Sequence, residues 1–514
     1  MPRGGRALAA ALLSGAWLTL AFPEPDLYVV AWFALAPLII LCAREPVTAR
    51  RLGSYPRSPS AGRGALLGFV FGLGFFGTLL YWISIVGWVA WGLLVLLQAG
   101  LLALFGLGAA LNARLPTTAV RVVLIASAWT AVELLRSIVP IFGFTWGQLA
   151  QSQHNAGWML RPAAWGGAWA VAWIVCAVNA SLAEAWTRRR RGGLAVLAAA
   201  ALLVAAPLLL PAADPAAGSP ALVAIVQGNV PREIPEAGAA REEAILARHV
   251  QLTRDLAGRG LDLIVWPESS IGIDLDRDRV ARATVEGAAE ASGSAVIAGA
   301  NLDVDADRYL VMAFHIDPVD GLIDRYQKTH LVPFGEYVPG RRFLNWVPLL
   351  AQVPRDAIAG TAGTLFTPPA VPGPVAPVIS FEGDFGSLVR SRIGAGGRLL
   401  IVATNTSTWR ESWASAQHVA MSQVRAAENR VWVVHAALSG ISALVAPDGS
   451  VVERTPLWTA TTLEGDVRLP ERVSFYARTG DWLGWGSVVV GLIGALVGTR
   501  RRPTVREELH GTAR

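Results

Sequence analysis

Polar side chains follow apolar runs at three places in the second half of the chain, and their types suit acid–base and acyl-transfer chemistry. Glu268 follows the run LIVWP, and Ser380 follows PVI. Between them, the segment KTHLVPFGEYVP begins with Lys328 and contains Glu336. A base needs a carboxylate whose pKa is raised by a partly dry site, and a developing oxyanion needs a compact cation close by. If the three strand ends meet in one pocket, these residue types could act on a single carbonyl group.

Lys328 is the only lysine in the chain, since 43 of the 44 basic residues are arginine. Random placement would rarely put that lysine in this segment, and arginine could not replace it because a guanidinium is bulkier and does not give up its proton. The alternatives are a surface lysine in a loop and, for Glu268, a solvated acid at a strand end. The neighbours of Lys328 and the Trp-Pro before Glu268 favour a shared site.

The elements that position these residues are expected within residues 212–481, where short apolar runs alternate with helical patterns. Such alternation is typical of a mixed α/β layer fold. The predicted buried strands are 221–230, 261–266, 294–300, 377–380 and 399–404, and the predicted amphipathic helices are 240–257, 277–292 and 412–429. The Pro-rich stretch 367–377 is expected to be a loop.

These segments together resemble the nitrilase (carbon–nitrogen hydrolase) superfamily, whose Glu, Lys and Cys follow three such strands of an αββα sandwich. The apolar segments fused to them narrow the resemblance to the apolipoprotein N-acyltransferases. The resemblance covers essentially the whole chain and includes FTWGQLAQSQ at 144–153 and SGISA at 439–443. KTHLVPFGEYVP at 328–339 is its most specific motif, whereas WPE alone would be weak.

The resemblance implies a role for each matching residue. Glu268 would be the general base, Lys328 would stabilise the oxyanion, and Glu336 would orient the lysine and the nucleophile. The residues expected to bind substrate are Glu382, Trp266, Tyr337 and Trp146. Two of these have alternative explanations, because Glu382 also fits a simple strand-end acid and Trp146 also fits an interfacial anchor.

The nucleophile position departs from the family, which has cysteine where this chain has Ser380. The two cysteines, Cys42 and Cys176, fall within apolar segments and are expected to be core residues. A hydroxyl is far less acidic than a thiol and usually needs an imidazole base, for which His330 and His435 are the nearest candidates. Two interpretations follow: Ser380 forms an oxyester in place of a thioester, or the chain keeps the scaffold and has lost acyl transfer.

The composition indicates a membrane protein. Of the 514 residues, 53% are hydrophobic and 16% are charged, and the mean hydropathy is +0.44, whereas soluble domains carry roughly 25% charged residues. The net charge of +6 does not indicate nucleic-acid binding, because arginines cluster beside apolar segments, as in 188–191 and 500–502. We predict a polytopic α-helical domain joined to the nitrilase-like αββα domain.

Eight apolar stretches are long enough to be predicted as membrane helices. They lie at about 7–22, 26–42, 64–86, 88–112, 119–139, 163–186, 193–211 and 482–499. The first also resembles a signal peptide, but the apolar character resumes after 22–25, and the orientation needs this helix. The predicted division is 1–211 with seven membrane helices, 212–481 as the catalytic domain, 482–499 as the last membrane helix, and 500–514 as a basic tail.

Arginines in the short loops predict the orientation, since basic residues favour the cytoplasmic side. Placing both termini in the cytoplasm puts five basic loops or ends inside and delivers 212–481 to the outside. The basic residues assigned to the inside are Arg3, Arg6, Arg44, Arg50, Arg51, Arg57, Arg63, Arg114, Arg121, Arg188 to Arg191 and Arg500 to Arg502. Arg161 is the exception. The predicted location is the bacterial cytoplasmic membrane, with the catalytic domain outside.

The resemblance implies a two-step acyl transfer from a phospholipid to the N-terminal amine of a diacylglyceryl-cysteine lipoprotein, with both substrates held in the membrane. No metal or diffusible cofactor is implied, since no ligand-spaced His/Cys/Asp cluster occurs. A membrane-tethered amidase is one alternative. A non-catalytic paralogue that binds lipoproteins or partners another acyltransferase is another, and Ser380 favours it. A transporter is disfavoured because few charges lie mid-helix and no inverted repeat is visible.

Overall fold

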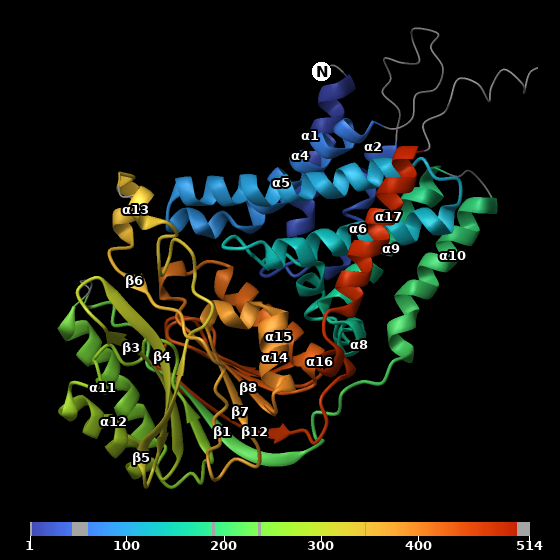
Figure 1. Ribbon diagram of the computed structural model, residues 1–514. Helices are drawn as coiled ribbons and strands as arrows, with labels where there is room; N and C mark the ends of the chain where they lie inside the picture. The colour runs from blue at the N-terminus through green and yellow to red at the C-terminus, as the bar shows by residue number, and fades with distance from the viewer. Residues whose placement is uncertain (1–2, 44–59, 188–190, 235–237, 345, 501–514) are drawn as a thin grey trace, which may run out of the picture.

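The chain folds into a helical part and an α/β part that pack against each other (Figure 1). The computed structural model describes residues 3–43, 60–187, 191–234, 238–344 and 346–500. The predicted inner arginines at 44–57 and 188–190, and the basic tail from 501, lie outside these residues.

Each of the eight predicted apolar stretches contains a helix. These helices are α1 (Arg3–Thr19), α2 (Ala36–Ala43), α4 (Ala61–Leu79), α5 (Trp88–Asn112), α6 (Thr118–Ile138), α9 (Ala168–Thr187), α10 (Arg191–Ala205) and α17 (Trp482–Arg500). Five of them, α4, α5, α6, α9 and α17, are long and apolar enough to cross a membrane, and shorter apolar helices cover 28–43 and 193–209. The count of eight crossings therefore stays a prediction.

The stretch predicted at 163–186 is broken at Gly167, which separates the short α8 (Ala163–Gly166) from α9. Gly167 has φ +69°, and a Cβ atom there would lie 2.6 Å from the Tyr476 ring. Only glycine combines that backbone conformation with so close an approach. Tyr476 lies on α16 (Phe475–Thr479), so this break lets the membrane helices pack against the α/β part.

The α/β part contains two β-sheets. The first has the order β12-β1-β2-β3-β4-β5, with β6 pairing β4 in parallel. Its strands are β1 (Ser219–Gln227), β2 (Leu263–Val265), β3 (Ala295–Asp303), β4 (Arg308–Asp317), β5 (Gly321–Gln327), β6 (Asp356–Ala357) and β12 (Thr461–Leu469). The second has the order β11-β10-β9-β8-β7, made of β7 (Val375–Ile379), β8 (Leu399–Thr404), β9 (Trp432–Ala437), β10 (Ala443–Val445) and β11 (Val451–Arg454).

Side chains alternate between the two faces of each strand, and this period of two builds four layers. Val265 of β2 and Ile401 of β8 belong to the core between the sheets. The outer face of the first sheet packs against α11 (Ala239–Asp255) and α12 (Arg279–Ser292). The outer face of the second packs against α14 (Gly386–Gly394) and α15 (Ala414–Asn429). The predicted αββα sandwich is confirmed.

All five predicted strands and all three predicted helices are present, with ends shifted by a few residues. The sequence prediction missed β4, β6, the four strands from β9 to β12, α14, and the short helices α13 (Arg341–Leu344) and α16. It expected a strand to end before Lys328, which is β5, but gave that strand no bounds. One shift matters for chemistry: Ser380 was predicted as the last residue of a strand, but β7 ends at Ile379 and Ser380 begins the turn η6 (Ser380–Asp384). Cys42 and Cys176 are both buried in helices, as expected.

Candidate active site

Glu268 lies three residues after the end of β2, on a turn that passes close to β3. A Cβ atom on Gly299 would lie 2.5 Å from the Pro267 carbonyl oxygen and 2.6 Å from the Glu268 Cα atom, so the turn needs glycine beneath it. The Glu268 side chain is 10% exposed, and its Oε2 accepts a hydrogen bond from the Asn405 backbone N–H at 2.9 Å. The carboxylate is thus fixed from both sheets.

Lys328 directly follows β5 and is held by its own backbone as well as by its charge. Its backbone N–H donates to the Val311 carbonyl of β4 at 2.9 Å. Its ammonium group is 1% exposed, and Nζ lies 2.6 Å from Glu336 Oε1 and 3.2 Å from Glu268 Oε1. Glu336 Oε2 also accepts a hydrogen bond from the Val332 N–H at 2.7 Å, so the loop closes back on the lysine.

Burial and charge set the protonation states of this group. Loss of hydration raises the pKa of Glu268, and although Lys328 acts in the opposite direction the net shift is upward. Burial alone would lower the pKa of Lys328, but Glu268 and Glu336 more than offset this, and the pKa is raised. Lys328 therefore stays an ammonium at neutral pH, and Glu268 is a stronger base than a solvated carboxylate.

Ser380 is presented by a strained backbone turn where β7 ends. Its φ of +50° is rare for a residue other than glycine, and such conformations cluster at active sites. Its Oγ accepts a hydrogen bond from Thr404 Oγ1 at 3.2 Å. Thr404 ends β8 and is followed by Asn405, which binds Glu268. Ser380 is therefore joined to the Glu268–Lys328–Glu336 group through two adjacent residues.

Glu382 lies beneath the site rather than in it. Its Oε1 accepts hydrogen bonds from the backbone N–H groups of Thr329 and His330, at 2.8 and 3.0 Å, and its Oε2 accepts one from the Ile379 N–H at 2.8 Å. The Tyr326 hydroxyl lies within 2.8 Å of both oxygens. Because these protein donors occupy a fully buried carboxylate, Glu382 ties the lysine loop to the serine turn and does not face substrate.

We expect Glu382→Gln to lower the turnover of this site by about 10-fold or more, with little change in KM, because the lysine loop and the serine turn would no longer be held together. The amide would place an N–H against backbone donors and remove charge-assisted hydrogen bonds worth roughly 1.5–3 kcal/mol each. Single-turnover kinetics check this. Glu290→Gln, at an exposed position on α12, is the matched control, and equal rates in the two variants would contradict this role.

Trp266 and Trp146 are not placed to bind substrate, contrary to the prediction. Trp266 follows β2 on the outer face of the first sheet, where Nε1 donates to Thr253 Oγ1 at 2.8 Å. Trp146 is 2% exposed, and its Nε1 donates to Gln417 Oε1 of α15 at 2.7 Å. Its ring packs against Trp409, so it anchors the helical part on the α/β part.

Two charged residues of α6 hold the loop that carries Trp146. Glu133 Oε1 accepts a hydrogen bond from the Leu149 backbone N–H at 2.8 Å. Arg136 donates to the Trp146 carbonyl and, through Nε, to Gln98 Oε1 at 2.6 Å. These two buried charged residues therefore fix the loop that carries Trp146, which accounts for their position in an apolar helix.

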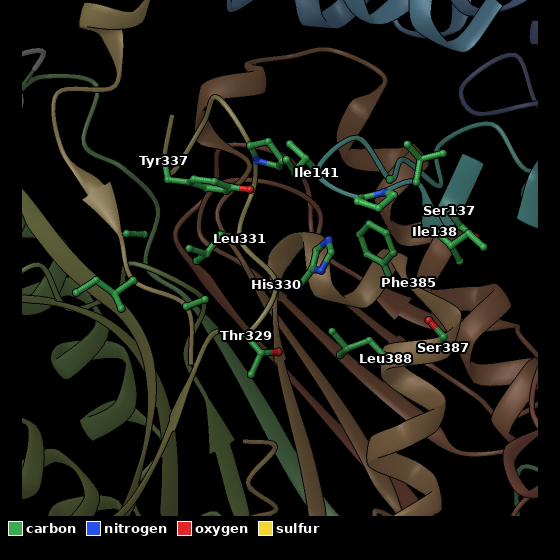
Figure 2. Close-up of a pocket in the computed structure, with 17 residues that line it drawn as sticks. Ser137, Ile138, Ile141, Thr329, His330, Leu331, Tyr337, Phe385, Ser387 and Leu388 are labelled. Atoms are coloured by element: carbon green, nitrogen blue, oxygen red, sulfur yellow. The ribbon is translucent and has the colours of Figure 1, made fainter. Parts of the chain in front are cut away.

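A cavity of about 860 Å³ lies between the end of α6 and the loop that follows Lys328 (Figure 2). Its wall includes Thr329, the residue after Lys328, but none of Glu268, Lys328, Glu336 and Ser380. Its apolar wall includes Ile138, Ile141 and Leu388, and its polar wall includes His330 and Tyr337. Tyr337 is thus the one predicted substrate-binding residue that lines this cavity. Both the helical part and the α/β part contribute to its wall.

The two histidines considered as serine activators have different surroundings. His435 lies under α15, where its Nδ1 is 2.8 Å from Ser422 Oγ, and burial holds its pKa well below the usual value. His330 lines the cavity and packs against Phe385 with ring centroids 4.2 Å apart. The residue that contacts Ser380 Oγ is instead Thr404, which the prediction missed although it ends the apolar run LIVA.

Comparison with known proteins identifies two matching families. The apolipoprotein N-acyltransferase N-terminal domain matches residues 14–181, and the carbon–nitrogen hydrolase family matches residues 222–476. A protein named apolipoprotein N-acyltransferase from Geobacter metallireducens is 32% identical over 96% of this chain and 95% of its own length. One of the same name from Gloeobacter violaceus is 29% identical over 95% and 93%. A solved amidase from Nesterenkonia sp. has 17% identity and a TM-score of 0.38, and covers 52% of this chain and 97% of its own.

Proposed function

This chain belongs to the apolipoprotein N-acyltransferase family of the carbon–nitrogen hydrolase superfamily, and we propose that Glu268, Lys328, Glu336 and Ser380 carry out its acyl transfer. The family is one of acyltransferase enzymes, and both domain matches support N-acylation of lipoproteins. The observation that carries the proposal is the buried ammonium of Lys328, held between two carboxylates on a loop that Glu382 ties to the strained turn of Ser380.

In the first half-reaction, Ser380 Oγ attacks an ester carbonyl of a phospholipid while Glu268 accepts the hydroxyl proton. The Lys328 ammonium stabilises the oxyanion of the tetrahedral intermediate, and Glu336 keeps Lys328 in place. The C–O bond to the glycerol breaks, Glu268 returns the proton to the leaving oxygen, and an oxyester remains on Ser380. The hydrogen bond from Thr404 supports the same Oγ when it departs later.

In the second half-reaction, the α-amino group of a diacylglyceryl-cysteine attacks the oxyester. The new N–C bond forms, the C–Oγ bond breaks, and Glu268 transfers a proton from the amine to Ser380 Oγ. Lys328 again stabilises the oxyanion. The products are the N-acylated lipoprotein and the free enzyme, so the cycle needs no further reactant.

We also propose that the α/β part, which lies between α10 and α17 in the sequence, is on the outer side of the cytoplasmic membrane. Both chain termini would then be cytoplasmic. Arg114 donates to the Gly498 carbonyl near the end of α17 at 3.1 Å, and Arg63 donates to the Leu41 carbonyl at 2.8 Å. Helix α17 runs away from the α/β part and ends at Arg500 (Figure 1), so the end of the helical part that Arg114 contacts lies on the far side, which fits a cytoplasmic excess of basic residues. The cavity at the opposite end then opens where lipid substrates are held.

Expression in bacteria depleted of their own N-acyltransferase tests the proposal. We expect lipoprotein N-terminal peptides to regain the mass of the third acyl chain, and Glu268→Gln to lose this by at least about 100-fold because no base remains. Glu453→Gln, on the exposed strand β11, is the matched control and should behave as the parent. A folded parent chain that leaves the peptides diacylated would overturn acyl transfer and favour a binding or partner role.

A further inference from the structure

All residues that line the 860 Å³ cavity belong to the described part of the chain. Among them, His330 is the one residue whose side chain has an ordinary pKa between 5 and 8. The other polar side chains of the wall are hydroxyls, those of Ser137, Thr329, Tyr337 and Ser387. His330 lies two residues after Lys328, on the same loop. A titratable group therefore faces the cavity from the loop that also carries Lys328, and the mechanism above does not use it.

The ring of His330 is held in place while its nitrogen atoms stay available. It packs against Phe385 and Phe381, with ring centroids 4.2 and 5.9 Å apart, and Phe381 directly follows Ser380. The backbone N–H donates to Glu382, which fixes the main chain. Within the described residues, neither ring nitrogen makes a hydrogen bond, and Figure 2 shows the ring in the middle of the cavity wall.

The second half-reaction requires a proton acceptor that Glu268 does not supply. A free α-amino group has a pKa of about 7.7–8.0, so near pH 7 the acceptor arrives mainly as an ammonium and cannot attack. Glu268 is enclosed by Lys328 and the Asn405 N–H, and it already transfers one proton during attack. The excess proton of the ammonium must therefore go to water or to another base, and a base that faces the incoming substrate would receive it directly.

The surroundings of His330 keep its imidazole unprotonated before the acceptor arrives. Burial is the largest effect on the pKa of His330 and lowers it, and the Lys328 charge lowers it further. The charges of Glu382 and Glu336 raise this pKa, but the net shift is downward. Phe381, Phe385 and the hydroxyl-bearing wall residues add no charge. The imidazole is thus neutral near pH 7 and has a free lone pair.

We propose that His330 accepts the excess proton from the α-ammonium group of the lipoprotein as this acceptor enters the cavity. The proton moves from the substrate nitrogen to the imidazole, and the neutral amine then forms the N–C bond as the C–Oγ bond of Ser380 breaks. The imidazolium returns its proton to water after the product leaves. This inference rests on the proposed acyl transfer and adds a base that acts in the second half-reaction alone.

The test separates the half-reactions in single turnovers of the full chain. A phospholipid with a labelled acyl chain first loads Ser380, and a synthetic diacylated lipopeptide with a free amine is then added. We expect His330→Gln to slow transfer to the lipopeptide at pH 6.5, where roughly one amine in 20 is unprotonated, by about 10-fold more than it slows formation of the acyl-enzyme. The deficit should shrink towards pH 9, and added imidazole should reduce it.

Hydroxylamine provides an acceptor that is neutral at pH 7, so parent and His330→Gln should transfer to it at equal rates. His315→Gln is the matched control, because burial also lowers the pKa of His315 and its ring packs on Phe366, but it lies on β4 outside the cavity wall. His330→Asn gives a second test if the glutamine variant is unstable.

Three results would overturn the inference. They are transfer to the lipopeptide at the parent rate by His330→Gln, an equal deficit with hydroxylamine, and a deficit that does not change with pH. A parent chain that never loads Ser380 would instead overturn the proposed function and this inference with it.

Discussion

Replacing Lys328 with methionine is expected to reduce formation of the acyl-enzyme by about 100- to 1,000-fold and to destabilise the α/β part. Removal of one oxyanion donor costs about that factor in other acyl-transfer sites. Methionine also leaves Glu268 and Glu336 without the ammonium that lies 3.2 and 2.6 Å from them. Breaking a buried ion pair by removing one partner typically costs roughly 3–5 kcal/mol. Labelled-phospholipid loading and thermal unfolding measure the two effects.

Two companion variants separate catalysis from stability. Lys328→Arg keeps a positive charge, so we expect it to recover part of the stability while staying almost inactive, because the larger guanidinium cannot occupy the same position. The double variant Lys328→Met/Glu268→Gln removes one of the unpaired carboxylates and should be more stable than Lys328→Met alone. Lys328→Met with near-parental loading would show that the lysine is structural and that another group stabilises the oxyanion.

The second large effect is expected at Ser380. Ser380→Ala should abolish the labelled acyl-enzyme, whereas Ser380→Cys should load roughly 10-fold or more faster than the parent. A thiol has a pKa near 8.5 and becomes a thiolate readily beside a carboxylate base and an ammonium, whereas a hydroxyl does not. Cysteine fits the turn as serine does, since the two side chains differ by one atom. Rapid-quench loading, with mass spectrometry of the peptide that contains residue 380, is the measurement.

The comparison between the three chains also decides between the two interpretations of the nucleophile. Loading by the parent that alanine abolishes shows that Ser380 works as an oxyester nucleophile. Loading by Ser380→Cys alone would show that the chain keeps the scaffold and has lost the acyl-transfer step. After the loaded protein is denatured, so that the site no longer catalyses the reaction, hydroxylamine at neutral pH cleaves the thioester of the cysteine variant and leaves an oxyester intact.

The structure also indicates why acyl transfer should depend on how the two parts dock. The cavity wall combines residues from the end of α6 with the loop after Lys328, so neither part forms it alone. Arg136 and Glu133 fix the loop that carries Trp146, and Trp146 hydrogen-bonds to α15. A change at this interface, more than 100 residues from the lysine in sequence, would therefore alter the substrate cavity.

The sequence by itself determined the class of fold and the identity of the charged residues. Local patterns were sufficient, because apolar stretches predict membrane helices and short apolar runs between helical patterns predict the layered α/β domain. The single lysine in KTHLVPFGEYVP pointed to the site without any knowledge of contacts. The period of two along β2 also places Trp266 opposite Val265, on the outer face, whereas the family resemblance implied a substrate-binding position for it.

Only the tertiary structure decided what depends on contacts between distant segments. Glu382 could be recognised as a tie between loop and turn only once its partners, more than 50 residues earlier, were in place. The contact of Thr404 with Ser380, the docking role of Trp146 and the free nitrogens of His330 have the same origin. Each depends on the arrangement of side chains around it, and local residue patterns specify which elements form without specifying those contacts.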